Sequence, residues 1–238
     1  MPIQSSDGQR FAQWNEEMAR KYNPEAYHLR SNRLIRWIER RRVKAILQFL
    51  NPDRQDNVLE VGCGAGNMLE QIPAGQLHGI DLSTFLLKKS QSRLAQRRAR
   101  LVLADAEHLP FASGQFGRLV CTEVLEHVPD PCQVVSEMAR VATADAVLVI
   151  SVPNERWISW AKGVIRTLGL SRWLLHGGSK DTYNSPDKMT DEWHLHSFDL
   201  ALLRKILENI LLIRQTKAIP LGFVPLRYVV RCQVILHL

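Results

Sequence analysis

The feature that most constrains the fold is a short apolar segment that runs directly into alternating glycines. Residues 58–61 predict a buried strand, residues 62–66 form the pattern G-x-G-x-G, and residues 67–72 are expected to open a helix. Glycine lets the backbone turn tightly and approach a ligand closely, and the free N–H groups of a helix N-terminus suit a carboxylate or a phosphate. The spacing differs from the dinucleotide pattern G-x-G-x-x-G, so the loop by itself also fits a purely structural turn.

Strands and helices are expected to alternate beyond this loop. The expected strands span residues 77–80, 101–103, 118–121 and 146–150. Ser83 is expected to cap a helix that reaches about residue 98, and Asp130-Pro131 is a typical start for another. The sequence therefore predicts an α/β fold with a doubly wound, Rossmann-like parallel sheet and right-handed crossovers. Ligands of such sheets bind outside the carboxyl ends of the strands.

Four regions are expected along the chain. Residues 1–52 are interpreted as a helical N-terminal cap or substrate lid, residues 53–152 as the ligand-binding core, and residues 153–196 as an insertion that caps the substrate. Residues 197–238 are expected to complete the core, with a helix capped by Ser197 and an antiparallel pair of edge strands at 211–216 and 228–236. Aromatic residues of the flanking regions could line an apolar substrate pocket or merely hold the insertion on the core: Trp14, Tyr22, Tyr27, Trp157, Trp160 and Trp173.

Charge is distributed unevenly along the chain. Residues 1–50 and 151–238 each carry a net charge of +5, whereas residues 51–150 carry −3. The basic flanks could attract an anionic substrate, a membrane surface or nucleic acid, and they could equally be a solvated face. No apolar run is long enough to span a membrane, and the first ten residues lack the apolar stretch of a signal peptide, so a cytoplasmic protein is expected. The four cysteines form no C-x-x-C pair, which predicts reduced thiols and no metal site.

Acidic residues follow the predicted strands. Asp81 could accept hydrogen bonds from both hydroxyls of a ribose, or it could cap the helix that follows. Asp105 could accept from an adenine amino group while the backbone N–H of Ala106 meets the ring, or it could be an exposed turn residue. With Glu60 before the glycines and Glu123 after the fourth strand, the pocket favours a cation or a hydroxyl-rich ligand over a polyphosphate.

Four of these segments together resemble class I S-adenosylmethionine-dependent methyltransferases, most closely the branch that includes the ubiquinone and menaquinone biosynthesis methyltransferases. The segments are the glycine loop, GIDLS at 79–83, DAEHLPF at 105–111 and EVLEHV at 123–128, in the order and at the spacing of the family. The resemblance covers residues 55–152, and it is weak in the last third. It implies a seven-stranded sheet with an antiparallel last strand and S-adenosylmethionine as the cofactor.

The resemblance also implies roles for individual residues. Gly62, Gly64 and their loop would hold the methionine part of the cofactor, Asp81 the ribose, and Asp105 with Ala106 the adenine. Thr122 or Glu123 would line the sulfonium end. The full set of expected cofactor contacts is Glu60, Gly62, Cys63, Gly64, Asp81, Leu82, Asp105, Ala106, Thr122 and Glu123.

Methyl transfer from a sulfonium needs a general base only if the acceptor holds a proton at neutral pH. The candidate bases are His127, His194 and His196, with His28 and His108 more remote. The alternation of His194 and His196 would let their side chains share a face of an extended segment. Histidines at that spacing without cysteine or carboxylate partners favour a structural role over metal binding, and we expect no metal-assisted mechanism.

The sequence thus predicts methyl transfer to a small-molecule or lipid-linked acceptor, with peripheral contact to a membrane as an option. An RNA or protein methyltransferase is the alternative suggested by the basic residues between 30 and 44, although no RNA-binding module is recognised and nucleic acid is not an expected partner. A cofactor-binding regulator without catalysis stays open, and a NAD-dependent dehydrogenase is the alternative for the fold alone. Neither the acceptor nor the oligomeric state follows from the sequence.

Overall fold

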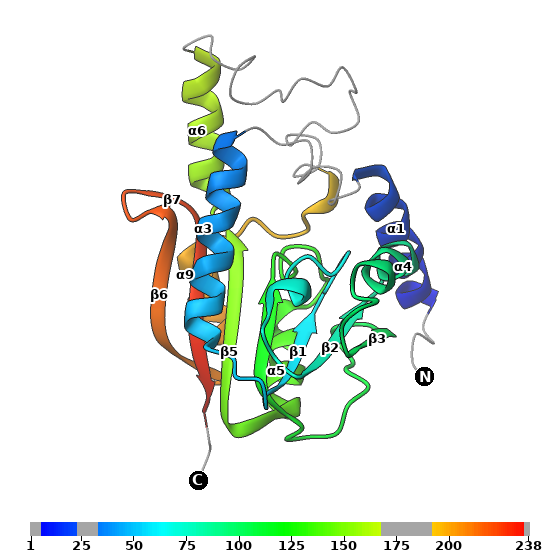
Figure 1. Cartoon of the computed structure of the whole chain (residues 1–238). Coiled ribbons are helices and arrows are strands. Elements are labelled where there is room, and N and C mark those ends of the chain that lie inside the picture. The colour runs from blue at the N-terminus through cyan, green and yellow to red at the C-terminus, as the bar shows by residue number, and fades with distance from the viewer. Residues whose placement is uncertain (1–5, 23–32, 168–191, 236–238) are drawn as a thin grey trace.

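A seven-stranded sheet with the order β3-β2-β1-β4-β5-β7-β6 forms the centre of the molecule (Figure 1). The computed structural model describes residues 6–22, 33–167 and 192–235. Seven strands make up the sheet: β1 (Asn57–Val61), β2 (Gln76–Asp81), β3 (Ala99–Leu103), β4 (Phe116–Thr122), β5 (Ala142–Pro153), β6 (Leu211–Leu221) and β7 (Val224–Val234).

Pairing in the sheet follows the doubly wound pattern. Strand β1 pairs in parallel with β2 on one side and with β4 on the other, and Val61 stands level with both Ile80 and Cys121. Strand β7 is antiparallel to β5 and to β6, so it is inserted between them. The strand order therefore reverses between β1 and β4, where ligands of open α/β sheets bind. The sequence prediction of a Rossmann-like sheet with an antiparallel last strand is confirmed.

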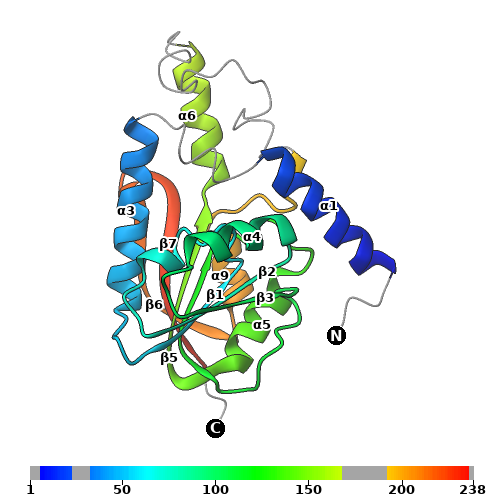
Figure 2. The same ribbon diagram turned by 45° about the vertical axis from the view of Figure 1, so that its right-hand side comes forward.

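Helices cover both faces of the sheet. Helix α3 (Arg33–Leu50) packs Ile38, Ile46 and Leu50 onto one face, which also receives α4 (Thr84–Arg93). Helices α5 (Pro131–Val141) and α9 (Leu200–Leu207) pack on the opposite face around the buried Phe198. Figure 2 shows these layers. Apolar residues on both faces of strands such as β5 explain why the sequence reads as a continuous apolar run there.

Two helices lie near the carboxyl ends of the parallel strands. Helix α6 (Glu155–Thr167) continues upward from β5, and α1 (Ser6–Tyr22) lies beside α4 (Figure 1). The side chain of Glu16 in α1 accepts a hydrogen bond from Ser83 Oγ at 2.6 Å, and Ala19 and Tyr22 pack with Leu86 and Trp193. Both flanking regions therefore contribute walls above the sheet. Among the described helices, none combines the length and the apolar character needed to span a membrane.

Some predicted boundaries were wrong. The helix after the glycine loop is only the 3₁₀ turn η1 (Leu69–Gln71). Helix α4 ends at Arg93, and Arg97 turns toward η1, donating to the carbonyl of Ile72 at 2.6 Å. The cap of α9 is Asp199, whose carboxylate accepts from Leu202 N at 2.9 Å, and not Ser197. The predicted cap of α4 is confirmed, because Ser83 Oγ accepts from Leu86 N.

The division into four regions stays a prediction. Tyr27 and His28 of the N-terminal region and Trp173 of the insertion lie outside the described residues.

Candidate active site

A cavity of about 700 Å³ opens at the carboxyl ends of β1, β2 and β4. Its walls come from the glycine loop, from α3 and from α6, and from the segment that precedes α9. All of the expected cofactor contacts line this one cavity: Glu60, Gly62, Cys63, Gly64, Asp81, Leu82, Asp105, Ala106, Thr122 and Glu123. The structure thus brings together residues that lie up to 63 positions apart, and their contacts with a cofactor stay predictions.

The glycine loop needs glycine for its backbone conformation. Gly62 and Gly64 have φ angles of 71° and 51°, in the left-handed region that side chains disfavour. A Cβ on Gly62 would also overlap the side chain of Val124. Cys63 N donates to Ile80 O at 2.8 Å, which ties the loop to the end of β2. The loop is therefore a fixed turn over the cavity floor.

Asp81 ends β2 and faces the glycine loop. One carboxylate oxygen accepts from Gly64 N and the other from Ser83 N, each at 2.8 Å. Burial raises the pKa of Asp81 to about 6, although the two N–H donors favour the charged form. The carboxylate thus links the loop to the start of α4, and the free lone pairs of its oxygens remain for a ligand at the cavity wall.

Two carboxyl groups at the cavity are almost fully buried. Glu60 is 2% exposed and Glu126 is 1% exposed, and Oε2 of each lacks a hydrogen-bond partner among the described residues. Burial raises the pKa of each well above its usual value. A buried polar atom without a partner is costly, so a ligand with cationic or N–H groups would stabilise this part of the cavity.

The part of the cavity where the adenine is expected to bind is less buried. Asp105 Oδ1 accepts from Glu107 N at 2.9 Å, which fixes the turn after β3. Asp105 and Ala106 both line the cavity. Asp105 lies in a turn, as one alternative held, but it is partly buried rather than exposed, and its second oxygen remains able to accept from a ligand.

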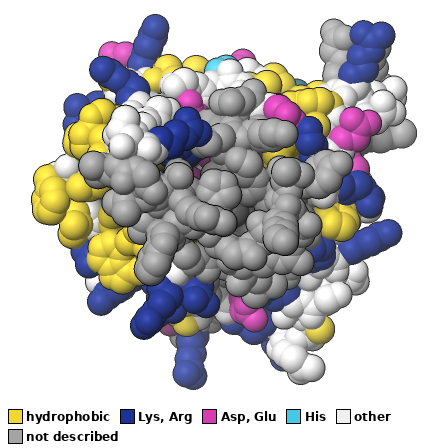
Figure 3. All heavy atoms as spheres, turned by 90° about the horizontal axis from the view of Figure 1, so that it is seen from above, with side chains coloured by type: hydrophobic (Ala, Val, Ile, Leu, Met, Phe, Trp, Pro, Cys, Tyr) yellow, Lys and Arg dark blue, Asp and Glu magenta, His cyan; other side chains and the backbone are white. Residues whose placement is uncertain are grey.

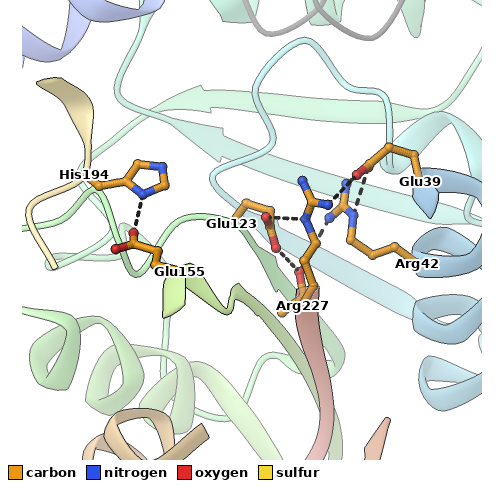
Figure 4. A network of polar contacts seen from close by, with 7 residues as sticks. Glu39, Arg42, Glu123, Glu155, His194 and Arg227 are labelled. Carbon is orange, nitrogen blue, oxygen red and sulfur yellow. Dashed lines mark hydrogen bonds and ion pairs between the residues drawn. The ribbon is translucent and has the colours of Figure 1, made fainter. Parts of the chain in front are cut away.

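A network of charged side chains closes the cavity at the end of β4 (Figure 4). Glu123 has a φ angle of 54°, unusual for a residue with a side chain. Its oxygens accept from Arg227 Nε at 2.8 Å and from Ser151 Oγ at 3.0 Å. Arg227 also contacts Glu39 at 3.2 Å, and Glu39 pairs with Arg42 at 2.8 Å. The network joins α3, β4 and β7.

Electrostatics keep Glu123 charged. Burial raises the pKa of this carboxyl, but Arg227 and Arg42 outweigh that effect and hold it below its usual value. The sequence analysis missed Glu39, Arg42 and Arg227 as site residues. The partners of Glu123 come from helix and strand segments up to 104 positions away, so no local pattern could identify them.

The candidate bases are arranged around the segment that precedes α9. His194 Nδ1 lies 2.5 Å from Glu155 Oε1, and the His127 ring centroid lies 4.8 Å from that of His194. His127 Nδ1 contacts the carbonyl oxygen of Trp193 at 3.1 Å. Because both Nδ1 atoms are engaged, Nε2 is the nitrogen of each ring that remains for a ligand. Burial and the neighbouring His194 lower the pKa of His127 to about 4, so this ring is neutral at pH 7.

The expectation that His194 lacks a carboxylate partner was wrong, because Glu155 supplies one. His196 does not join this group, since its Nε2 contacts the carbonyl oxygen of Val128 at 2.9 Å and the residue does not line the cavity. The side chains of His194 and His196 therefore lie in different environments, and only that of His194 lines the cavity. His108 is exposed and pairs loosely with Asp105, and His28 lies outside the described residues.

Glu126, His127 and His194 place one ligand atom each within 4.8 Å of one another, close enough to hold a metal ion. No local sequence pattern indicates this group, because His194 is 67 positions from His127. The absence of a metal site stays a prediction from the sequence.

Comparison with known proteins identifies the family. The model of the family described as "Methyltransferase domain" matches residues 59–150. The ubiquinone biosynthesis O-methyltransferase of Psychrobacter cryohalolentis is 32% identical over 132 residues, which are 52% of this chain and 51% of that protein. Methyltransferase GfsG of Streptomyces halstedii is 32% identical over 118 residues, 47% of this chain and 42% of that protein. The chain spans about half the length of the curated relatives that it matches.

Solved structures show the same fold. The N-methyltransferase NodS of Bradyrhizobium japonicum, crystallised with S-adenosyl-L-homocysteine, has a TM-score of 0.61 at 16% identity and matches 90% of this chain and 98% of that one. A SAM-dependent methyltransferase of Methanosarcina mazei has a TM-score of 0.60 at 20% identity, over 81% of this chain and 98% of that one. The glycine loop, the acidic strand ends and these matches agree, and residues 59–150 belong to the class I S-adenosylmethionine-dependent methyltransferases, enzymes whose cofactor is S-adenosylmethionine.

Proposed function

We propose that the protein transfers a methyl group from S-adenosylmethionine to a hydroxyl group of an amphipathic small-molecule or lipid-linked acceptor. The observation that carries the proposal is that His194, which lines the cavity, contacts Glu155 behind it. The names of the curated relatives, several of which are O-methyltransferases, support a hydroxyl acceptor.

The described residues fit the cofactor. Asp81 presents a carboxylate for ribose hydroxyls, and Glu60 presents a buried oxygen without a partner for the positively charged amino end. The glycine loop leaves space, because a Cβ on Gly64 would meet no atom within 4 Å. When bound, S-adenosylmethionine supplies a methyl carbon that is activated for displacement. Holding this carbon in line with the acceptor contributes up to roughly 7–11 kcal/mol to lowering the barrier.

His194 is suited to take the proton of the acceptor hydroxyl. As the acceptor oxygen forms its new bond to the methyl carbon, the carbon–sulfur bond of the donor breaks and its electron pair stays on the sulfur, which leaves as a thioether, while the hydroxyl proton moves to Nε2 of His194. The carboxylate of Glu155 lies at Nδ1 of the same ring, fixes the tautomer and stabilises the imidazolium that forms. Burial raises the pKa of Glu155, but hydrogen bonds from His194 and Ser197 outweigh that effect and hold it below its usual value. A base of this kind contributes about 10²–10⁴-fold to the rate.

The remaining walls suit an apolar acceptor. Ile35 and Ile38 of α3 face the cavity, as do Ile158 and Ala161 of α6. Apolar walls exclude water from the transfer site and bind the body of the acceptor. The neutral ring of His127 lies beside His194 and adds an uncharged wall at pH 7.

The proposal is tested by following labelled methyl groups. The full-length protein is incubated with S-adenosylmethionine carrying a labelled methyl group and with fractionated cell extract. We expect the label in the small-molecule or lipid fraction as a methyl ether. Label confined to RNA or protein, or no transfer at all from a protein that binds the cofactor, would overturn the proposed acceptor class.

A pair of variants separates catalysis from binding. His194→Gln is expected to slow transfer about 100-fold or more while its affinity for S-adenosylhomocysteine stays unchanged. His196→Gln is the matched control, because that ring does not line the cavity and its Nε2 contacts the backbone carbonyls of Val128 and Pro129. Equal transfer rates in the two variants would show that His194 does not act as the base.

A further inference from the structure

The arginines that line the cavity fall into two groups. Arg42, Arg93 and Arg227 each contact a carboxylate at 3.2 Å or less. Arg36 and Arg40 also line the cavity, but they are exposed and have no ion-pair partner within the described ranges 6–22, 33–167 and 192–235. Two of the carboxylates that line the cavity, Glu39 and Glu70, are already paired with Arg42 and Arg93. Two cations at the cavity wall are therefore left without a counter-charge from this part of the chain.

These two arginines lie on one side of α3. Residues four positions apart are neighbours on a helix surface, so Arg36, Arg40 and Lys44 form a row of cations along α3. Arg40 and Lys44 also border a second, shallower hollow of about 420 Å³, whose apolar wall is formed by Val43 and Leu47. Arg40 thus lies where the two hollows meet. Figure 3, which views the molecule from the end at which α3 begins, shows basic side chains around the rim.

The other cations of α3 have different neighbours. Arg41 donates to the carbonyl oxygen of Pro220 at 2.9 Å and lies over the ring of Trp37. Arg42 belongs to the buried network with Glu39. The row of Arg36, Arg40 and Lys44 is therefore distinct from the groups that hold α3 against the sheet.

We propose that the acceptor carries an anionic group, a phosphate or a carboxylate, and that Arg36 and Arg40 bind this group at the mouth of the cavity, with Lys44 adding to the attraction. The inference rests on the proposed function, because it places the apolar body of the acceptor against Ile35 and Ile38 and its anionic end on the next turns of α3. Guanidinium groups form strong, directed hydrogen bonds to both anions. The carboxylate of Asp81, which is charged at pH 7, repels the same group from the acidic half of the cavity and so fixes the orientation of the acceptor.

The test measures binding, so it does not depend on turnover. The full-length protein saturated with S-adenosylhomocysteine is titrated with decyl phosphate, decanoate and uncharged decyl maltoside. We expect both anions to bind more tightly than the maltoside, with an affinity that falls as salt is added. The double variant R36Q/R40Q is expected to lose about tenfold or more of the anion affinity and none of the maltoside affinity.

Matched variants guard against indirect effects. R204Q/K205Q on the exposed side of α9 removes the same two charges far from the cavity and is expected to bind like the native protein. R36K/R40K keeps both charges and is expected to retain most of the anion binding. A glutamine variant that had misfolded would be recognised because it would also lose its affinity for the maltoside. Equal affinity of the native protein for the anions and the maltoside, or an equal loss in both glutamine variants, would overturn the proposal.

A further comparison distinguishes the source of the anion. Vesicles of phosphatidylcholine with and without phosphatidylglycerol are added to the native protein and to R36Q/R40Q. Binding to anionic vesicles that requires the two arginines points to a lipid-borne acceptor, and binding of decyl phosphate alone points to a soluble one. Failure of S-adenosylhomocysteine to bind the native protein would instead contradict the proposed function.

Discussion

Glu155 Oε1 lies 2.5 Å from His194 Nδ1, and this contact joins the first turn of α6 to the segment before α9. The backbone reinforces the junction, because Glu155 N donates to Phe198 O at 3.1 Å and Leu195 N donates to Glu126 O at 2.7 Å. Backbone hydrogen bonds therefore hold the segments of both residues in place, and Nε2 of His194 is left to face the cavity. A carboxylate that orients an imidazole is a common arrangement for general-base catalysis.

Replacing the carboxylate tests this arrangement. In Glu155→Gln the imidazolium would lose its negatively charged partner, and we expect the turnover number to fall about 10–100-fold while the affinity for S-adenosylhomocysteine is kept. Steady-state kinetics and isothermal titration supply the two readouts. Glu208→Gln, at the exposed end of α9, is the control. A parallel loss of binding and turnover would assign Glu155 a structural role only.

Binding of the cofactor product should depend on the ionisation of Asp81. Burial raises the pKa of this carboxyl to about 6, and the charged form is the one that accepts hydrogen bonds from ribose hydroxyls. Protonation therefore competes with the ligand, so affinity is full above pH 7 and falls about tenfold per pH unit below about 6. Titrations with S-adenosylhomocysteine between pH 5 and 8 measure this. An affinity that stays constant over that range would contradict the assigned contact.

The two glycines of the loop should differ in their tolerance of a side chain. Gly62→Ala both strains a left-handed backbone and overlaps Val124, whereas Gly64→Ala meets only the backbone strain. We expect the free energy of unfolding to fall by about 1 kcal/mol for Gly64→Ala and by about 2–4 kcal/mol for Gly62→Ala. Urea unfolding compares them. Equal losses would mean that Val124 moves aside freely.

The charged network should couple two residues far apart in the sequence. Arg227→Met leaves Glu123 without its nearest cation, and Glu123→Gln removes the charge from the other side. A double-mutant cycle is expected to give a coupling energy of about 1–3 kcal/mol. Thermal and urea unfolding of the four proteins provide the cycle. Additive effects of the two single changes would show that the contact contributes nothing to stability.

Much of the fold could be predicted because its signals are local. Each of these signals spans only a few residues. They are the strand that leads into Gly62, the acidic residues at the ends of β2 and β3, and the Asp-Pro start of α5. Each of these patterns constrains the backbone directly, through glycine conformation, helix capping or apolar burial. They were sufficient to predict the parallel part of the sheet and the edge of the sheet at which the cavity lies, whereas the antiparallel last strand of a seven-stranded sheet and most of the expected cofactor contacts were implied by the resemblance to the methyltransferase family.

The rest of the site depends on tertiary contacts that leave no local trace. Arg227 meets Glu123 only because β7 is inserted beside β5, and Glu155 meets His194 only because the segment before α9 crosses the end of β4. Arg97, just beyond the end of α4, likewise donates to the carbonyl oxygen of Ile72, 25 positions away. Such contacts follow from the packing of the whole chain, and local sequence patterns do not encode them.

The most direct test is calorimetric titration of the purified protein with S-adenosylhomocysteine, beside NADH and beside the variant Asp81→Ala. The cavity at the ends of β1, β2 and β4 predicts saturable binding of S-adenosylhomocysteine, no binding of NADH, and a loss of at least about tenfold in Asp81→Ala, which removes a charged hydrogen-bond acceptor. Binding of NADH in preference to S-adenosylhomocysteine, or full affinity in the variant, would contradict the assignment of this cavity to the methyl donor.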